Sequence, residues 1–249
     1  MYQKERLDHI LQIVKGYGYV TVKYLVANLH YSNATINRDL NLLEKQKKIK
    51  RTYGGVEYIE TREIPVRFRY YKMRSAKVKI AKRAAELVAD SEVIFIDAST
   101  TCEFMAEYLA EKKKITVITN NMALVMRLSE YGINAVCLGG RIVETPCMLD
   151  GVETVENAMK YCADKAFFSV ETLTEDGRLG TGEMYYNLYN AMIRCSSEAY
   201  LLIDHEKMKK KGIGKRVLGD LSIVKGVVSD YEFKGETVEK FKGVQFIKA

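Results

Sequence analysis

Residues 32–55 read SNATINRDLNLLEKQKKIKRTYGG, and this stretch decides the fold of the N-terminal region. Ser32 is a good N-cap for a helix from Asn33 to about Gln46, because its hydroxyl can accept a hydrogen bond from a free backbone NH group. The apolar side chains of this helix share one face: Ile36, Leu40 and Leu43. A hairpin is predicted next, because strand-like residues flank the pair Gly54-Gly55, with Ile49 to Tyr53 before it and Val56 to Ile59 after it.

Two more helices are predicted upstream of this segment. Apolar residues in the first one follow the i, i+3, i+4, i+7 spacing of an amphipathic helix: Leu7, Ile10, Leu11 and Val14. Gly16 and Gly18 end it, and Thr21 can cap the second helix, Val22 to Leu29. Three short helices and a hairpin in this order describe a winged helix-turn-helix. We therefore predict a DNA-binding domain over residues 1–60.

The positive charge of the chain is concentrated in its first third. The 249 residues include 39 Lys or Arg and 32 Asp or Glu, a net charge of +7. Residues 1–74 hold 15 basic and 7 acidic residues, whereas residues 75–249 hold 24 and 25. A localised basic excess indicates a polyanion, because each phosphate contact by Lys or Arg releases condensed counterions. The charge therefore favours double-stranded operator DNA as a partner, with a solvated basic surface as the alternative that charge alone leaves open.

The helix that follows the turn is expected to enter the major groove, with its N-terminal residues at base edges. Asn bonds adenine bidentately, Arg bonds guanine, and Ser and Thr suit bases or phosphates. The candidate DNA-binding residues are Thr21, Ser32, Asn33, Thr35, Asn37, Arg38, Asn41, Lys48, Arg51 and Tyr53. Asp39 on the same helix would repel phosphate. We expect it to pair with Arg38, a lysine or the wing, or to face the domain interior.

The segment from Ser32 to Gly55 resembles the signature of the DeoR-type bacterial transcriptional regulators, roughly S-x-x-T-I-R-R-D-L-x-x-L-E-x-x-G-x-L-x-R-x-x-G-G. The shared residues are Ser32, Thr35, Ile36, Arg38, Asp39, Leu40, Leu43, Glu44, Arg51, Gly54 and Gly55. Two positions depart from it, since Asn37 stands where the family usually has Arg and Lys47 where it usually has Gly. The resemblance implies operator binding, and the first departure is expected to change base preference or to remove one phosphate contact.

The rest of the chain predicts a larger α/β domain. Residues 61–75 contain Pro65 and five basic residues and are predicted as a basic linker. Short apolar runs then alternate with helical patterns, which indicates a parallel sheet covered on both faces. The strand candidates are 93–96, 115–118, 135–138, 166–170, 200–203 and 225–228. We predict that residues 76–249 form a parallel-sheet domain for effector sensing and oligomerisation.

Polar residues and glycines follow several of these strands, and parallel sheets bind ligands beyond the carboxyl ends of their strands. Hydroxyls and free NH groups at a helix start form an anion cradle, and glycines let a ligand approach the backbone. The candidate effector-binding residues are Asp97, Ser99, Thr100, Thr101, Thr119, Asn120, Gly139, Gly140 and Lys207.

This domain also resembles the DeoR-type effector domain, which is similar in fold to ribose-5-phosphate isomerase. The matching residues are Lys77 or Lys79 before Ile80-Ala81 and Ala84-Ala85, then Asp97 with Thr100-Thr101, Thr119-Asn120, Gly139-Gly140, and Asp204 with Lys207. The resemblance implies that a phosphorylated sugar or related metabolite sits on the Thr100-Thr101 loop, with Lys207 reaching the phosphate or a sugar oxygen. Ser99 replaces the glycine of that loop, and His205 stands where a small polar residue is more usual.

No cofactor and no metal are expected. The five cysteines are scattered without a CxxC pair, and the three histidines stand far apart, so neither a disulfide framework nor a zinc site is predicted. No apolar run approaches the ~20 residues of a membrane helix, and the charged N-terminus is no secretory signal. We therefore expect a cytoplasmic protein with no membrane partner. A helix-turn-helix usually reads paired half-sites, so a homo-oligomer is expected, a dimer or a tetramer.

These features together predict a DNA-binding transcriptional regulator and not an enzyme. We expect a repressor of a sugar or carbohydrate metabolism operon, released from its operator by a phosphorylated sugar or related metabolite. Two alternatives stay open. The second domain can serve oligomerisation alone, without an effector. A sugar-phosphate isomerase that uses Asp97, Asp204 or Lys207 for proton transfer is the other, and the fused DNA-binding module argues against it.

Overall fold

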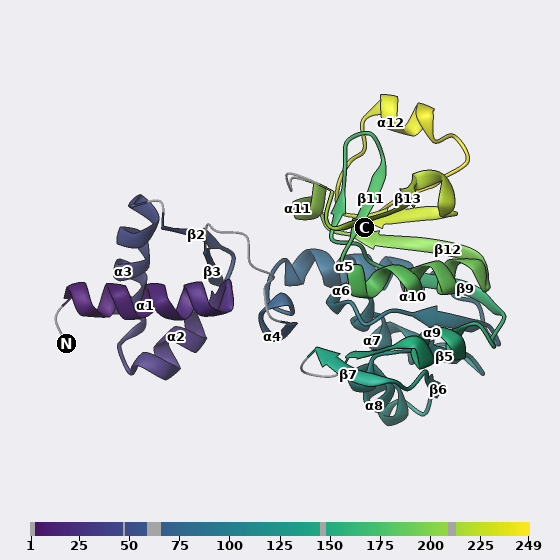
Figure 1. Cartoon of the computed structure of the whole chain (residues 1–249), viewed down its shortest axis with the longest axis horizontal. Coiled ribbons are helices and arrows are strands. Elements are labelled where there is room, and N and C mark those ends of the chain that lie inside the picture. Colours follow the sequence, from purple (N-terminus) through teal and green to yellow (C-terminus); the bar gives the residue numbers. More distant parts are fainter. Residues whose placement is uncertain (1–2, 47, 59–65, 145–147, 209–212) are drawn as a thin grey trace. The chain divides into compact units, whose positions relative to one another are not determined.

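The computed structural model describes residues 3–46, 48–58, 66–144, 148–208 and 213–249 (Figure 1). The chain divides into two compact units, Met1–Arg74 and Ser75–Ala249. Lys47, where the signature has Gly, lies outside the described residues, as does Pro65 of the predicted linker. Within the described ranges, no helix combines the length and apolar character needed to cross a membrane.

The first unit is a winged helix-turn-helix. Its described elements are α1 (Gln3–Tyr17), β1 (Tyr19–Thr21), α2 (Val22–Leu29), α3 (Asn33–Lys45), β2 (Ile49–Thr52), β3 (Gly55–Tyr58) and α4 (Val66–Arg69). The strands form one antiparallel sheet in the order β1-β3-β2. The predicted helices and hairpin are confirmed. Strand β1 was not predicted, because three residues are too few to show alternation and the strand depends on its pairing with the distant β3.

Local hydrogen bonds set the turn between α2 and α3. Thr21 Oγ1 accepts a hydrogen bond from the Tyr24 backbone NH at 3.0 Å and caps α2. Ser32 Oγ accepts one from the Thr35 backbone NH at 3.2 Å and caps α3, as predicted. Between them, His30 ends α2 in the left-handed region, at φ 57°, and its NH donates to the Val26 carbonyl. These caps fix where the recognition helix α3 begins.

A buried hydrophobic core joins the helices and the sheet of this unit. It includes Ile10, Val14, Leu25, Ile36, Leu40, Leu43, Ile49 and Val56. Phe68 of α4 belongs to the same core, and its ring meets those of Tyr17 and Tyr24 edge to face, at centroid distances of 5.5 and 5.3 Å. A residue of the predicted linker therefore contributes to the packing of the first unit.

Asp39 lies on the core side of α3 and is fully buried. The Arg6 guanidinium of α1 donates two hydrogen bonds to its carboxylate, from Nε to Oδ2 at 2.5 Å and from Nη2 to Oδ1 at 3.1 Å. The bond to Asp39 raises the pKa of the Arg6 guanidinium. Asp39 thus faces the interior, one of the predicted outcomes, and its partner comes from a helix 33 residues earlier.

The second unit is built on a seven-stranded sheet in the order β15-β14-β12-β9-β4-β5-β6, and every neighbouring pair is parallel. The strands are β4 (Val93–Ile96), β5 (Thr116–Thr119), β6 (Asn134–Cys137), β9 (Ala163–Phe168), β12 (Ser196–Ile203), β14 (Gly226–Ser229) and β15 (Gln245–Lys248). The predicted fold class is confirmed. Strand β15 was not predicted, because its four residues carry only one partly buried apolar pair.

Helices and small sheets surround this central sheet. The helices are α5 (Arg74–Ala85), α6 (Thr100–Glu103), α7 (Met105–Leu109), α8 (Met122–Glu130), α9 (Val152–Ala158), α10 (Glu183–Arg194), α11 (His205–Met208) and α12 (Gly235–Lys240). The smaller strands are β7 (Arg141–Glu144) with β8 (Met148–Asp150), and β10 (Thr172–Leu173) with β11 (Arg178–Thr181) and β13 (Arg216–Asp220). The helical segment that follows β4 is divided into α6 and α7 at Phe104.

Three adjacent central strands end beside one another. Strand β4 ends before Asp97, β9 ends before Ser169, and β12 ends before Asp204. We call the set of residues at this end of the sheet the carboxyl edge: Asp97–Thr101, Asn120, Ser169 and Asp204–Lys207. The parallel strand order therefore gathers polar residues that lie far apart in the sequence, as predicted for a ligand-binding crevice.

Replacing Arg6 tests the role of the buried carboxylate in the first unit. Arg6→Met leaves Asp39 buried without its cation, and we expect the opening free energy of α1 and α3 to fall by about 2 to 3 kcal/mol. Amide hydrogen exchange of peptides 3–17 and 33–45 in the full chain measures it. The exposed pair Arg83–Glu86 provides the control, because Arg83→Met should change the opening of α5 by less than about 1 kcal/mol. Unchanged exchange in α1 and α3 would contradict the assigned role.

Candidate functional site

Most of the predicted DNA-binding residues lie on α3 or on the wing formed by β2 and β3, whereas Thr21 ends β1, Ser32 precedes α3 and Lys48 precedes β2. Ser32, Asn33, Arg38 and Asn41 are exposed, and Thr35 and Asn37 are half-buried. The opposite face of α3 is buried in the core through Ile36, Leu40 and Leu43. Helix α3 therefore presents a continuous polar face to solvent, which is the arrangement that a recognition helix needs.

The hydroxyls of Ser32 and Thr21 are both used to cap helices. Ser32 Oγ also bonds Thr35 Oγ1 at 2.9 Å, so the first turn of α3 is held by two side-chain contacts. Caps of this kind leave other NH groups of the first turn free to meet a phosphate. The structure therefore places Ser32 and Thr21 where they position the helix ends.

Three asparagines lie four residues apart on α3, and Arg51 of β2 reaches across to two of them. We call Asn33, Asn37 and Asn41 the asparagine ladder. Arg51 Nη2 donates to Asn37 Oδ1, and Arg51 Nη1 donates to Asn41 Oδ1, each at 2.5 Å. Asn37 Nδ2 in turn donates to the backbone oxygen of Asn33 at 2.9 Å and to its Oδ1 at 2.6 Å. The wing and the recognition helix are thus joined through their candidate DNA-binding side chains.

The remaining candidates in this unit are exposed cations and the tip of the wing. Arg38 and Lys48 are exposed, and their side chains form no hydrogen bond or ion pair with any residue that the structure describes. Tyr53 is 90% exposed, next to Gly54, which turns the hairpin at φ +80°. An added Cβ at Gly55 would lie 2.5 Å from the Val20 carbonyl oxygen. The wing turn therefore needs glycine at both positions and holds Tyr53 out in solvent.

Asp97 at the carboxyl edge is buried and accepts four hydrogen bonds. Its Oδ1 accepts from the Ser99 NH at 3.1 Å and from Ser99 Oγ at 2.6 Å. Its Oδ2 accepts from the Ser169 NH at 3.1 Å and from the Tyr189 hydroxyl at 2.8 Å. Asp97 therefore fastens β4, β9 and α10 together. Its oxygens are occupied by protein donors, so it serves the shape of the site and is not a free base.

Two lysines reach the loop that surrounds Asp97. Lys77 of α5 is buried, and its Nζ donates to Thr100 Oγ1 at 2.9 Å. Of the two lysines left open by the sequence, Lys77 is therefore the one at the loop. Lys207 of α11 is half-buried, and its Nζ donates to Ser169 Oγ at 2.7 Å. Thr101 Oγ1 is buried and has no hydrogen-bond partner among the described residues.

Candidates near β5 and β6 have partners within the protein. Thr119 Oγ1 accepts a hydrogen bond from the Asn121 NH at 3.1 Å. Asn120 Nδ2 donates to the Leu149 carbonyl at 2.8 Å, while its buried Oδ1 meets no donor among the described residues. Gly139 and Gly140 are in the left-handed region, and an added Cβ at Gly140 would lie 2.1 Å from Thr154 Oγ1. The missing side chain of Gly140 thus makes room for α9, whereas the sequence suggested room for a ligand.

His205 is held by an acidic residue of the neighbouring strand end. Its backbone NH donates to Asp230 Oδ1 at 2.8 Å, and its Nδ1 lies 2.5 Å from Asp230 Oδ2. The buried Asp204 accepts the Glu206 NH at 3.1 Å. These contacts fix the start of α11 and so position Lys207 at the carboxyl edge.

Sequence reasoning missed Tyr189 and the role of Ser169. Tyr189 lies on α10, 92 residues after Asp97, and its hydroxyl also donates to the Ser169 carbonyl at 2.9 Å. Burial raises the pKa of the Tyr189 hydroxyl well above its usual range, and the nearby Asp97 carboxylate adds to the shift. The sequence around Tyr189 gives no signal for this contact. Ser169 lies within the strand predicted over residues 166–170, whereas β9 ends at Phe168, so the sequence did not mark Ser169 as a residue beyond a strand end.

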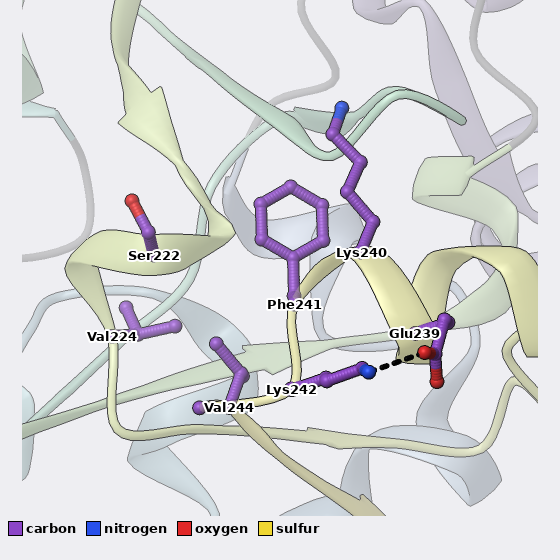
Figure 2. Close-up of a pocket in the computed structure, with 8 residues that line it drawn as sticks. Ser222, Val224, Glu239, Lys240, Phe241, Lys242 and Val244 are labelled. Carbon is purple, nitrogen blue, oxygen red and sulfur yellow. Dashed lines mark ion pairs between the residues drawn. The ribbon is translucent and has the colours of Figure 1, made fainter.

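A surface cavity of about 380 Å³ lies elsewhere in the second unit. It is lined by Ser222, Val224 and residues 239–244, where Glu239 and Lys242 form an ion pair across its rim (Figure 2). None of the candidate effector residues lines it. An open hollow of this kind is weak evidence for a ligand site. We place the site at the carboxyl edge, where Asp97 accepts four hydrogen bonds and two lysines converge.

No three His, Cys, Asp or Glu side chains come together to hold a metal ion anywhere in the described ranges. The cysteines that the structure describes are free: Cys102, Cys137, Cys162 and Cys195. Burial raises the pKa of the Cys102 thiol well above its usual range, which keeps it protonated beside Asp97.

Two family models match the chain. The model of the DeoR-like helix-turn-helix domain matches residues 6–62, and that of the DeoR C terminal sensor domain matches residues 72–231. The chain is 33% identical to the HTH-type transcriptional repressor GlcR of Bacillus subtilis, over 84% of this chain and 81% of that protein. It is 27% identical to the glycerol-3-phosphate regulon repressor of Escherichia coli, over 92% of both. It is 29% identical to the lactose phosphotransferase system repressor of Lactococcus lactis, over 84% and 85%.

Solved structures are similar at lower identity. Ribose 5-phosphate isomerase A of Methanocaldococcus jannaschii has a TM-score of 0.42 and 21% identity, over 55% of each chain. The translation initiation factor eIF-2B of Pyrococcus horikoshii has a TM-score of 0.47 and 15% identity, over 92% of this chain and 82% of that one. Both scores are below 0.5, so the strand order of the second unit carries its fold assignment.

Removing the Tyr189 hydroxyl tests whether it supports the carboxyl edge. Tyr189→Phe takes one donor from buried Asp97, and we expect the free energy of unfolding of the second unit at pH 7 to fall by about 1 to 3 kcal/mol. The raised pKa adds a pH signature, because the folded hydroxyl stays neutral while the unfolded one ionises near pH 10. This stability is present below about pH 10 and is lost as the pH rises toward the folded pKa, at about 1.4 kcal/mol per pH unit.

Urea unfolding followed by circular dichroism between pH 7 and pH 11 measures both effects. At alkaline pH, unfolding of Tyr189→Phe should release one proton fewer than unfolding of the unaltered chain, so its free energy of unfolding should fall less steeply with pH. Tyr131→Phe, which deletes a hydroxyl on a residue that is 44% exposed, is the matched control and should alter neither quantity. Equal alkaline slopes for the Tyr189 variant and the unaltered chain would contradict the assignment.

Proposed function

The chain belongs to the DeoR family of transcriptional regulators, and we propose that it represses a sugar or carbohydrate metabolism operon until a phosphorylated sugar or related metabolite binds. The observation that carries this proposal is the union, in one chain, of a DeoR-like helix-turn-helix and a DeoR sensor domain. The names of the similar repressors, for the glycerol-3-phosphate regulon and the lactose phosphotransferase system, support the choice of substrate class.

Operator binding is assigned to the first unit. Residues 1–74 hold 15 basic and 7 acidic residues, and the exposed Arg38 and Lys48 lie on α3 and beside the wing. Charge of this kind supplies affinity for phosphates, and the polar face of α3 supplies contacts to base edges. We assign DNA contact to the exposed residues of α3 and the wing, with Ser32 and Thr21 positioning the helix ends.

Effector binding is assigned to the carboxyl edge of the second unit. Lys77 and Lys207 approach the Asp97–Thr101 loop from two helices and donate to Thr100 Oγ1 and Ser169 Oγ, and ammonium groups are donors of the kind that phosphate and sugar oxygens accept. The unmatched Thr101 Oγ1 and Asn120 Oδ1 lie at the same edge. This cluster of donors supports a phosphorylated polyol as the ligand class.

The same geometry argues against sugar-phosphate isomerisation. An isomerase needs a carboxylate within reach of the substrate's C1 and C2, and Asp97 is buried with four protein donors. Asp204 is buried as well and caps α11. We therefore assign sensing and not catalysis to this edge. A homo-oligomer, a dimer or tetramer located in the cytoplasm, is part of the proposal, because a helix-turn-helix usually reads paired half-sites.

Arg38→Ala tests the DNA-binding surface. We expect weaker operator binding, and we expect the slope of log affinity against log salt concentration to decrease in magnitude by about one, the share of one phosphate contact. The measurement is the operator dissociation constant by fluorescence anisotropy across a salt series. Lys113→Ala, which removes an exposed charge from the second unit, is the control and should keep both quantities. Equal affinities and slopes for Arg38→Ala and the unaltered chain would remove Arg38 from the surface.

Thermal unfolding in the presence of phosphorylated sugars tests the effector site. A ligand at 100 times its dissociation constant adds about 2.7 kcal/mol to the stability of the unit that binds it. A panel of pentose, hexose, tagatose and deoxyribose phosphates should contain at least one such compound. Lys207→Met should abolish the shift, because it removes a donor at the carboxyl edge, whereas Lys113→Met at the opposite end of β5 should keep it.

A panel without any stabilising compound would favour the second candidate, a regulator whose sensor domain only oligomerises. Selection of bound fragments from the native genome tests the proposed operon under either candidate. The genes beside the enriched fragments name the pathway, and enrichment of genes unrelated to carbohydrate metabolism would contradict the proposed operon.

A further inference from the structure

We propose that Arg51 sets the base preference of the recognition helix by holding the asparagine ladder in one amide orientation, so that Asn41 offers N–H donors and reads guanine instead of adenine. This inference rests on the proposed operator binding and specifies what one position of that surface recognises. It makes Arg51 a positioning residue for the neighbouring asparagines.

Arg51 determines the direction in which each amide points. A guanidinium carries donors only, so a side-chain amide that bonds to it must turn its oxygen toward it and its nitrogen away. Arg51 forks between the Oδ1 atoms of Asn37 and Asn41, at 2.5 Å from each. Bonds from a charged donor are stronger than those between neutral groups. Both amides are therefore fixed with their nitrogen atoms away from the wing.

Of the two amides that Arg51 holds, that of Asn41 remains available to DNA. Asn37 is half-buried, and its Nδ2 already donates to the backbone oxygen and to the Oδ1 of Asn33. Asn41 is exposed, and its Nδ2 donates to none of the residues that the structure describes. Asn41 therefore presents two N–H groups to solvent, next to the positive charge of Arg51.

The donors of Asn41 match the major-groove edge of guanine better than that of adenine. Adenine offers an acceptor at N7 and a donor at its 6-amino group, so bidentate reading by Asn needs Nδ2 to donate and Oδ1 to accept. At Asn41 the oxygen is bonded to Arg51, and an adenine amino group brought to it would face guanidinium N–H groups. Guanine offers two adjacent acceptors, N7 and O6. These match the donors of Asn41 and are attracted by the nearby cation.

The main chain of β2 holds Arg51 in this position. Its backbone NH donates to Glu44 Oε1 at 2.8 Å, which ties β2 to the last turns of α3. The strand begins at Ile49, which is buried in the core of the unit. Arg51 is thus anchored through its main chain to the helix whose side chains it orients, and the amide orientation is set before DNA arrives.

Selection from a random double-stranded DNA library tests the inference in the full-length protein. Asn41→Ala locates the position that Asn41 reads, because base preference disappears there. At that position the unaltered chain should select G·C, and Arg51→Met should shift the preference toward A·T by about 5- to 150-fold, the range of one good bidentate contact. Lys48→Met removes an exposed charge close to the wing that does not touch the ladder, so it should weaken binding to all sequences and keep the G·C preference.

Replacement of the selected guanine by 7-deazaguanine gives a test that needs no Arg51 variant. Loss of the N7 acceptor should weaken binding by about 5-fold or more. Selection of A·T by the unaltered chain at the Asn41 position, or the same preference in Arg51→Met, would overturn the inference while leaving operator binding intact. A library without any enriched sequence would overturn the proposed operator binding together with the inference.

Discussion

A carboxylate that leaves water has to be paired with a cation or supplied with hydrogen-bond donors, and each unit of this chain is organised around one such group. In the first unit, Asp39 of the recognition helix is fully buried and receives two hydrogen bonds from Arg6 of α1. In the second unit, Asp97 is buried at the end of β4 and receives four. The geometry of both candidate sites follows from these contacts, because they fix α3 in one case and the loop before α6 in the other.

Features that depend on neighbouring residues were predictable from the sequence. The caps at Thr21 and Ser32 are of this kind, since donor and acceptor lie three residues apart. The carboxyl edge was also predictable, because parallel strands must end on the same side and the residue after each strand is known once the strand is. For the same reason the prediction placed Asp97 and Lys207 together although more than 100 residues separate them.

Contacts between distant elements were not predictable in this way. Nothing near Tyr189 indicates that its hydroxyl meets Asp97, 92 residues earlier, and nothing near Arg6 indicates Asp39. Gly140 illustrates a different difficulty. The pair Gly139-Gly140 suggested a close approach by a ligand, whereas the space beside Gly140 is filled by Thr154 of α9. A glycine shows that something comes close to the backbone, and only the tertiary structure shows what it is.

The two sites differ in the internal contacts that a ligand meets. At the carboxyl edge, the ammonium groups of Lys77 and Lys207 donate to the hydroxyls of Thr100 and Ser169, so an anion that reaches this edge meets two cations. On the recognition helix, the oxygens of Asn37 and Asn41 are bonded to Arg51, so a base donor that approaches those oxygens meets the guanidinium N–H groups beside them. This crowding of donors disfavours the wrong base alone, because guanine makes no contact that needs the amide oxygen. The internal contacts of α3 therefore favour specificity, whereas those of the carboxyl edge hold two cations in place for an anion.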